Sequence, residues 1–424
     1  MSKNLSVKRT LFTGTLLLTA AGILSRFIGF FYKIFLSRTI GAEGLGIYQL
    51  IFPVMALCFS LTSAGIQTAG ARFYLLIGLI LSVCLSVFTG LFMWNHSEFI
   101  AGSFLQEMRC APLIKILSFC YVPCSIHSCI NGYYYGLKKA LVPSLSQLAE
   151  QSARVGGVYL IYLVAQSNGR SIAISDAVWG LVLGEFAGML VSLSFIGFGA
   201  CKGNIRKTTW SLLTMSFPLT LNRLTLNLFT TIENLLIPYQ LKLFGYSSSD
   251  ALSIYGILTG MAFAIIMFPT VLTNSISVLL LPVVSEAQAK HNDRLIREAI
   301  IKTTESCLLL GLLCTIGLLV LGDFIGNFIF KNALSATFIV TMSWICPFLY
   351  LGSTLNSIFH GLGKPGITLF LNLFSCLIRI LFIIFLIPVI GIKGYLTGLL
   401  ISQIALCVLA LLWLYRLMKK GSSG

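Results

Sequence analysis

Apolar residues run in long blocks along this chain, and short polar segments separate the blocks. The first block, Leu11 to Arg38, exceeds the roughly 20 residues that a helix needs to cross a bilayer. We count twelve such blocks and expect each to form a membrane-spanning helix. The predicted spans are 11–37, 45–68, 73–95, 111–134, 141–165 and 174–199 in the first half, and 209–238, 252–283, 303–330, 334–358, 366–390 and 394–416 in the second.

The composition supports this pattern. Only 10% of the 424 residues are charged and 57% are hydrophobic, whereas a soluble domain carries about 25% charged residues. The net charge of +16 does not indicate nucleic-acid binding, because the basic residues lie in short loops between apolar blocks. Loops on the side of the N-terminus hold 17 Lys and Arg residues, against 7 on the other side. The chain is therefore predicted to be an all-α polytopic membrane protein with both termini in the cytoplasm.

The two halves of the chain repeat each other. Glu43 to Tyr48 matches Asp250 to Tyr255 at an offset of 207, and Gly136-Leu137 matches Gly361-Leu362 at an offset of 225. Six spans per half give both repeats the same orientation, so we expect two parallel six-helix lobes around a central cavity. The predicted lobes are 1–204 and 205–420, followed by a flexible tail, 421–424.

Two local features are also predicted. Gly41 to Gly46 is interpreted as the turn after the first span. The charged segment from Ser285 to Lys302 is interpreted as a cytoplasmic linker with the pattern of an amphipathic helix, and we infer that the first half lacks an equivalent linker.

The first apolar block contains two cations, Arg26 and Lys33. Because seven residues separate them, they fall on nearly the same face of a helix. A cation at membrane depth costs about 3 to more than 10 kcal/mol, so it needs a wet cavity or a partner. We expect Arg26 to face the central cavity. Lys33, nearer the helix end, either does the same or extends to the membrane interface.

Polar stripes at helical spacing mark two corresponding spans. In the fifth span, Glu150 and Arg154 are spaced to pair at i, i+4, and in the eleventh span Arg379 matches Arg154 at the offset of 225. The stripes consist of Gln147, Glu150, Gln151 and Arg154 in the fifth span and Asn372, Ser375 and Arg379 in the eleventh. The amides and Ser375 suit helix-to-helix hydrogen bonds. For the two arginines a structural role and a substrate role both remain open.

The seventh span carries a third group, Arg223, Asn227 and Glu233. Glu233 is the repeat-mate of Arg26 at the offset of 207, so these two charges are predicted to oppose each other across the cavity. Arg26, Lys33, Arg223, Asn227 and Glu233 are the candidate substrate-binding residues. Glu185, isolated in the sixth span, is a candidate for a protonatable coupling site or for a partner of Arg154.

Cysteines and histidines do not suggest a metal. The cluster Cys120, Cys124, His127 and Cys129 lies in a hydrophobic segment without the CxxC spacing of zinc sites, so we expect no metal there. The sequence contains no P-loop, GxSxG or HExxH motif, which disfavours an enzyme or an ATP-driven pump. No cofactor is expected, although H⁺ or Na⁺ is a possible coupling ion.

Several motifs resemble one family of membrane proteins. Ser25 to Phe30 (Ser-Arg-x-x-Gly-Phe), Gly41 to Gly46, Thr62 to Gly65 and Phe359 to Pro365 are similar to segments of the stage V sporulation protein B family. That family belongs to the polysaccharide transporters of the multidrug/oligosaccharidyl-lipid/polysaccharide flippase (MOP) superfamily. The resemblance extends over most of the chain and is strongest in the first 70 residues.

This resemblance implies a flippase that moves a lipid-linked saccharide across the plasma membrane by alternating access. The implied cargo is the peptidoglycan precursor lipid II, for the spore cortex, and Arg26 is implied to line the cavity. The expected partners are this cargo and membrane lipids, with the protein a monomer. The alternatives are a cation-coupled multidrug exporter of the same superfamily, which needs acidic cavity residues, and a non-transporting membrane assembly factor.

Overall fold

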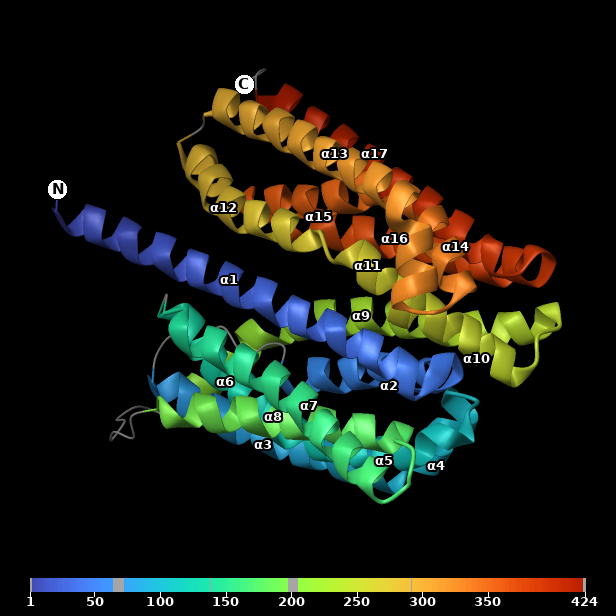
Figure 1. Ribbon diagram of the computed structural model, residues 1–424. Helices are drawn as coiled ribbons and strands as arrows, with labels where there is room; N and C mark the ends of the chain where they lie inside the picture. Colours follow the sequence, from blue (N-terminus) through green and yellow to red (C-terminus); the bar gives the residue numbers. More distant parts are fainter. Residues whose placement is uncertain (1, 64–71, 138, 197–204, 291, 422–424) are drawn as a thin grey trace. The chain divides into compact units, whose positions relative to one another are not determined.

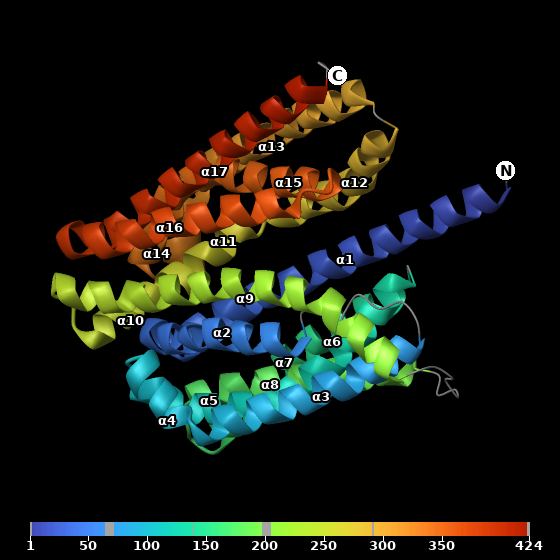
Figure 2. The same cartoon turned by 180° about the vertical axis from the view of Figure 1, so that it is seen from behind.

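The computed structural model describes residues 2–63, 72–137, 139–196, 205–290 and 292–421, and within these ranges it contains helices and no strand. The chain forms two compact units, Met1–Thr231 and Ile232–Gly424. Within each unit the long helices run side by side (Figures 1 and 2). The predicted all-α polytopic fold is confirmed. The predicted lobes, 1–204 and 205–420, stay a prediction.

The first unit begins with two long helices that are joined by one residue. Its helices are α1 (Ser2–Thr39), α2 (Gly41–Ser63), α3 (Arg72–Asn95), α4 (Ser97–Phe99), α5 (Ala111–Leu117), α6 (Tyr121–Gly136), α7 (Leu141–Ser167), α8 (Ile174–Ser194) and the first part of α9 (Ile205–Phe244). The predicted turn from Gly41 to Gly46 is wrong, because α2 already begins at Gly41. Gly41, at the junction of the two helices, has a φ of 73°, a conformation that suits glycine.

The second unit contains the rest of α9 and eight further helices. These are α10 (Ser248–Gly256), α11 (Phe263–Met267), α12 (Thr270–Ala289), α13 (Asp293–Phe324), α14 (Ala333–Met342), α15 (Cys346–Gly361), α16 (Pro365–Ile390) and α17 (Ile392–Gly421). The predicted amphipathic linker from Ser285 to Lys302 is not a single element. Ser285 to Ala289 end α12 and Asp293 to Lys302 begin α13, where the side chain of Asn292 caps the new helix by accepting from the Leu295 amide at 3.0 Å.

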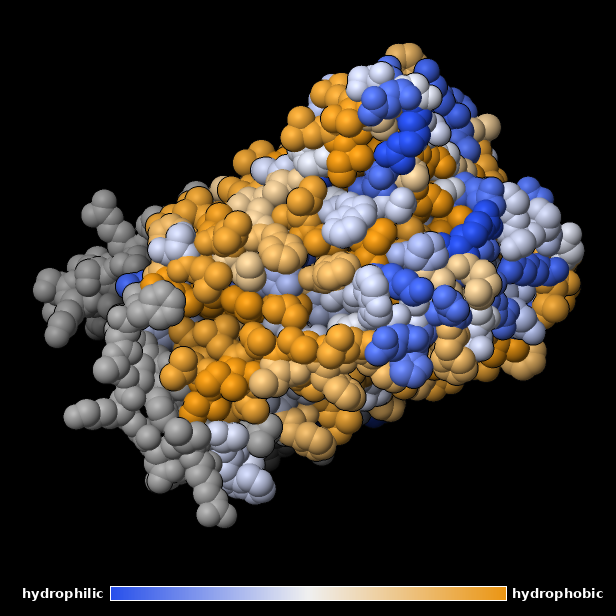
Figure 3. Space-filling model, turned by 90° about the horizontal axis from the view of Figure 1, so that it is seen from below, coloured by the Kyte–Doolittle hydropathy of each residue, from blue (hydrophilic) through white to orange (hydrophobic). Residues whose placement is uncertain are grey.

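Ten helical segments within the described ranges are long and apolar enough to cross a membrane. The two other predicted spans correspond to α7 and α9, which have 27 and 40 residues; α7 carries a polar stripe, and α9 carries Arg223, Asn227 and Glu233. Large apolar side chains are exposed along one side of α13, at Leu309, Leu313, Ile316 and Val320. Much of the face drawn in Figure 3 is likewise apolar, with the hydrophilic side chains gathered toward one end. An exposed apolar surface of this extent suits contact with lipid.

The internal repeat extends to details of the backbone. The π-helical turns Ile100–Phe104 and Ile325–Ile329 are separated by 225 residues, as are the 3₁₀ turns Ser118–Cys120 and Ser343–Ile345. Gln106 and Lys331, at the same offset, have positive φ angles of 53° and 54°. Such angles are uncommon for residues other than glycine. The predicted repeat is therefore present in the three-dimensional structure as well as in the sequence.

A ridge of three glycines on α8 allows this helix to lie directly against α7. Gly180, Gly184 and Gly188 recur every four residues, so they share one face of α8. A Cβ atom at Gly184 would lie 2.8 Å from the carbonyl oxygen of Glu150, closer than real Cβ contacts. Small residues at this spacing are the usual means by which membrane helices approach closely. The ridge thus brings the polar stripe of α7 next to Glu185 of α8.

We predict that Gly184→Ala destabilises the first unit by about 1–3 kcal/mol, because the added methyl group meets backbone that must shift. Thermal unfolding of the purified chain in detergent measures the effect. Gly156→Ala is the matched control, since a Cβ atom there has no neighbour within 4 Å. Equal melting temperatures for the two variants would contradict the proposed packing.

Candidate functional site

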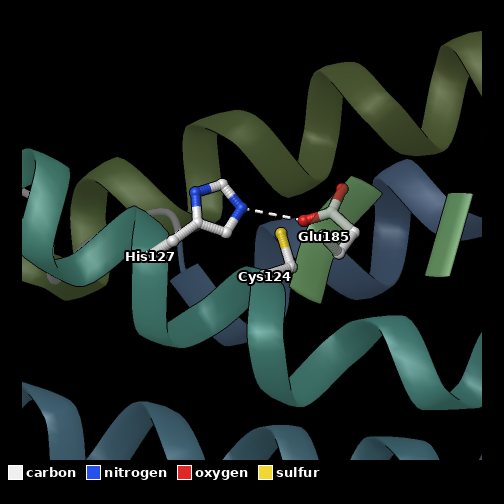
Figure 4. Close-up of side chains that lie close together, drawn as sticks. All are labelled: Cys124, His127 and Glu185. Carbon is white, nitrogen blue, oxygen red and sulfur yellow. Dashed lines mark hydrogen bonds and ion pairs between the residues drawn. The ribbon is translucent and has the colours of Figure 1, made fainter. Parts of the chain in front are cut away.

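A cluster of charged side chains lies inside the first unit, where α6, α7 and α8 pack together. Arg154 donates from Nη2 to Oε1 of Glu150 at 2.6 Å and lies 4.0 Å from Oε1 of Glu185. Glu185 Oε2 in turn lies 2.8 Å from Nε2 of His127 on α6 (Figure 4). All four side chains are largely buried. Both predicted partners of Arg154 are therefore present, and the i, i+4 pair within α7 is confirmed.

Hydroxyl and amide groups lie beside this cluster. Ser146 of α7 donates to the carbonyl oxygen of Gly188 at 3.0 Å and accepts from Ser192 at the same distance. The side-chain nitrogen of Asn131 lies 3.4 Å from both Ser146 Oγ and His127 Nδ1. These bonds join α6, α7 and α8 to one another, so they hold in place the three helices that carry the charged groups.

A second charged cluster lies in the second unit and joins α9, α16 and α17. The Nε of Arg379 donates to Oε1 of Glu233 at 2.7 Å, and the hydroxyl of Tyr395 donates to the same oxygen at 3.1 Å. Arg379 also donates from Nη1 to Ser375 Oγ at 3.0 Å and contacts the sulfur of Cys376 at 3.1 Å. The side chain of Glu233 is only 6% exposed. Its charge is thus neutralised within its own unit.

The two clusters differ although their arginines match in the repeat. Arg154 and Arg379 occupy equivalent positions of α7 and α16, but Arg154 pairs with a residue of its own helix and with α8, whereas Arg379 pairs with α9. Among the described residues, each of the four buried carboxylates has an arginine within 4 Å. These pairs are Glu107–Arg109, Asp176–Arg170, Glu185–Arg154 and Glu233–Arg379.

The candidate residues of the first span lie on α1. Arg26 and Lys33 are both half-buried, and they share one side of the helix as their spacing predicts. This helix packs along α7, where a Cβ atom at Gly29 would lie 3.9 Å from Oε1 of Gln151. Lys33 forms no ion pair with any residue that the structure describes. The role of Arg26 opposite Glu233 stays a prediction.

Two further candidates lie on α9, within the first unit. Arg223 is exposed, and Asn227 uses its side-chain nitrogen to bind α2 by donating to the Ala56 carbonyl at 3.2 Å and to the Ser60 hydroxyl. Four residues later, Thr231 Oγ1 lies 3.2 Å from the carbonyl oxygen of Pro53. Asn227 and Thr231 thus hold α9 against the segment of α2 that contains a proline.

Sequence reasoning missed His127 as a member of the charged cluster and Tyr395 as a partner of Glu233. Fifty-eight residues separate His127 from Glu185, and 162 separate Tyr395 from Glu233. Helical spacing relates only residues within a few turns, so it contains no signal for either pairing. The repeat offers one partial signal. Because Arg379 matches Arg154, which pairs with a glutamate, a glutamate partner could have been expected for Arg379 as well.

The fold of this chain is similar to that of solved membrane transporters. The inward-facing structure of a multidrug resistance MATE family transporter of the MOP superfamily superposes with a TM-score of 0.77 at 15% identity, covering 95% of this chain and 96% of that one. A MOP superfamily transporter from Pyrococcus furiosus, described as having a binding pocket of reverse polarity, superposes with a TM-score of 0.68 at 14% identity, covering 97% and 95%. The chain is a multi-pass membrane protein with the fold of MOP transporters.

Sequence comparison identifies the family. The model of the family described as polysaccharide biosynthesis protein matches residues 11–288, and the chain belongs to this family. Stage V sporulation protein B of Bacillus subtilis (strain 168) is 27% identical over 419 residues, which cover 91% of this chain and 80% of that protein. The lipid II flippase MurJ of the same organism is 22% identical over 403 residues, 84% of this chain and 73% of the flippase. The resemblance identified from the sequence motifs is confirmed.

We predict that Glu233→Gln or Arg379→Gln alone destabilises the second unit by about 3–5 kcal/mol, because each leaves a buried charge without its partner. The double variant should lose less than the sum of the two single losses. Thermal unfolding in detergent measures all three variants.

The control for this prediction is Glu298→Gln, which breaks the exposed pair of Glu298 with Lys302 and should leave the melting temperature unchanged. Strictly additive losses in the double variant would show that Glu233 and Arg379 do not stabilise each other.

Proposed function

We propose that this protein is a flippase that moves a lipid-linked saccharide, of the lipid II class, across the plasma membrane. The observation that carries the proposal is the balance of charge on the membrane-spanning helices. Buried carboxylates of the described residues lie within 4 Å of arginines, whereas Lys33 and Arg223 are cations without an ion-pair partner among those residues. Available positive charge suits an anionic cargo.

The chemistry of the proposed cargo explains why positive charge is needed along its path. A lipid pyrophosphate carries two or more negative charges and a large polar head, which needs a hydrated, cationic path through the hydrocarbon region. Arginine binds phosphate with two parallel hydrogen bonds, and lysine binds it as a point charge. In the proposal, Arg26, Lys33 and Arg223 contact the pyrophosphate while the lipid tail stays in the bilayer.

The same charge balance argues against export of cationic drugs. A carrier of organic cations needs a carboxylate that is open to its substrate. Glu185 lies against His127 and Arg154, and Glu233 lies against Arg379 and Tyr395. An organic cation that bound at Glu233 would have to displace Arg379 from a buried ion pair, which is costly, and Glu185 is enclosed by buried side chains.

The relatives support a more specific role. One is a sporulation protein and another is a lipid II flippase, which favours peptidoglycan precursor transport during spore formation. We propose alternating access driven by an ion gradient or by the membrane potential, with both chain termini in the cytoplasm and the protein acting as a monomer.

We predict that the intact chain translocates lipid II in reconstituted vesicles and that Arg26→Ala slows translocation by roughly 10-fold or more. This magnitude is expected for the loss of one hydrogen bond to a charged group. Arg38→Ala, at the exposed end of the same helix, is the matched control and should retain the rate.

Two outcomes would count against this proposal. No translocation by the intact chain would reject lipid II as cargo and favour a non-transporting assembly role. Equal rates for the intact chain and Arg26→Ala would reject the assigned role of Arg26.

We predict that a fluorescent protein fused after residue 421 matures in the cytoplasm, because basic loop residues gather on the side of the termini. An alkaline phosphatase fused at the same point should be inactive, since this enzyme requires export. Active phosphatase at the C-terminus would reverse the predicted orientation.

A further inference from the structure

Three side chains of different chemistry converge in the first unit, on the side of Glu185 that faces α6. Cys124 and His127 lie one turn apart on α6, and Glu185 reaches them from α8 (Figure 4). Their sulfur, nitrogen and oxygen atoms all lie within 4.8 Å of one another, and all three residues are buried. The Cys-x-x-His spacing alone is a weak signal. The third donor comes from 58 residues further along the chain.

The charges around this point favour a cation. Glu150 and Glu185 contribute two negative charges, and Arg154 contributes one positive charge. Protonation of His127, which lies 2.8 Å from Glu185, balances the remaining negative charge. With a neutral His127, one negative charge is uncompensated inside a membrane-spanning unit, where an unpaired charge is expensive. A divalent cation bound by a Cys124 thiolate, a neutral His127 and Glu185 brings the sum of all these charges to zero.

We propose that Cys124, His127 and Glu185 form a binding site for zinc(II) that links α6 to α8. Sulfur, imidazole nitrogen and carboxylate oxygen are the three ligand types that zinc accepts in proteins. Calcium and magnesium require sets of oxygen ligands, which this cluster does not supply. On binding, the thiol proton passes to solvent and the sulfur bonds to the metal. Three protein ligands leave the fourth tetrahedral position for a water molecule.

The distances allow the site to close with small movements. Tetrahedral zinc with bonds of about 2.0–2.3 Å holds its donor atoms about 3.3–3.8 Å apart. His127 Nε2 and Glu185 Oε2, now 2.8 Å apart, would separate slightly to admit the ion. The sulfur, which lies up to 4.8 Å from the other donors, would move about 1 Å by rotation of its side chain.

A neighbouring amide can orient the histidine for this role. Metal binding through Nε2 places the ring proton on Nδ1, which then needs an acceptor. Asn131 lies 3.4 Å from Nδ1, and rotation of its amide presents the oxygen there. The hydroxyls of Ser146 and Ser192, which bind Asn131 on its other side, can donate or accept as required.

The test uses the purified full chain in detergent, with zinc, cobalt or magnesium added after removal of metals by a chelator. We expect about one zinc per chain by elemental analysis and a melting temperature several degrees higher with zinc but not with magnesium. Cobalt, a spectroscopic substitute for zinc, should give the absorption band of sulfur-to-cobalt charge transfer. Acid should weaken binding, because protons compete for the ligands.

Cys124→Ser and His127→Gln should each lower the zinc affinity at least 10-fold and remove the stabilisation by zinc. Cys129→Ser is the matched control, because Cys129 is buried on the same helix but is not one of the three donors. The intact chain gives a decisive result by itself if a variant fails to fold. Absence of the charge-transfer band, or zinc binding that survives Cys124→Ser, would overturn the proposal. Transport activity does not enter this test.

Discussion

Neutralisation of carboxylates that lie away from water is the constraint on which both units depend. A carboxylate inside a membrane-spanning bundle cannot keep its hydration shell, so it needs a cation held by another part of the bundle. Glu233 satisfies this need with an arginine on a neighbouring helix, whereas Glu185 shares Arg154 with Glu150 and also lies against His127. The pairing fixes which faces of α8 and α9 turn inward. The glycine ridge of α8 then allows the approach that the contact between Glu185 and Arg154 requires.

The repeat preserves backbone geometry while the electrostatics have diverged. The π turns, 3₁₀ turns and positive φ angles recur at one offset, so the two halves have the same backbone conformation at equivalent positions. Their charged clusters are different. The second is closed, with one arginine on one glutamate and a tyrosine beside them, whereas the first holds two glutamates, one arginine and a histidine. The first cluster therefore contains more ionisable side chains than a single ion pair requires.

Much of the fold could be predicted from the sequence, because apolar block length and loop charge determine a membrane helix almost by themselves. The Glu150–Arg154 pair could be predicted too, since it depends on helical spacing alone. The predicted turn from Gly41 to Gly46 was wrong, because glycine was interpreted as a break although α2 begins at Gly41. The linker from Ser285 to Lys302 was predicted to be helical, and its helical residues are divided between α12 and α13.

The partners that bind across helices could not be predicted. Helical spacing does not indicate that Glu233 accepts hydrogen bonds from Arg379, Tyr395 and Cys376. The predicted opposition of Arg26 and Glu233 stays a prediction. Such pairing depends on which helices pack together and on how each is rotated about its axis. The spacing of residues along one helix determines neither of these. The meeting of Cys124 and His127 with Glu185 was hidden for the same reason.

Helix α9 determines where the chain can be divided into fragments. Helix α9 begins the second repeat, yet its first 27 residues, 205–231, belong to the first compact unit. Asn227 and Thr231 bind α2, and two residues later Glu233 binds α16. A chain cut at the repeat boundary would deprive the first fragment of these bonds. Helix α9 therefore contributes residues to both units, and a cut between the two repeats would not leave the first unit intact.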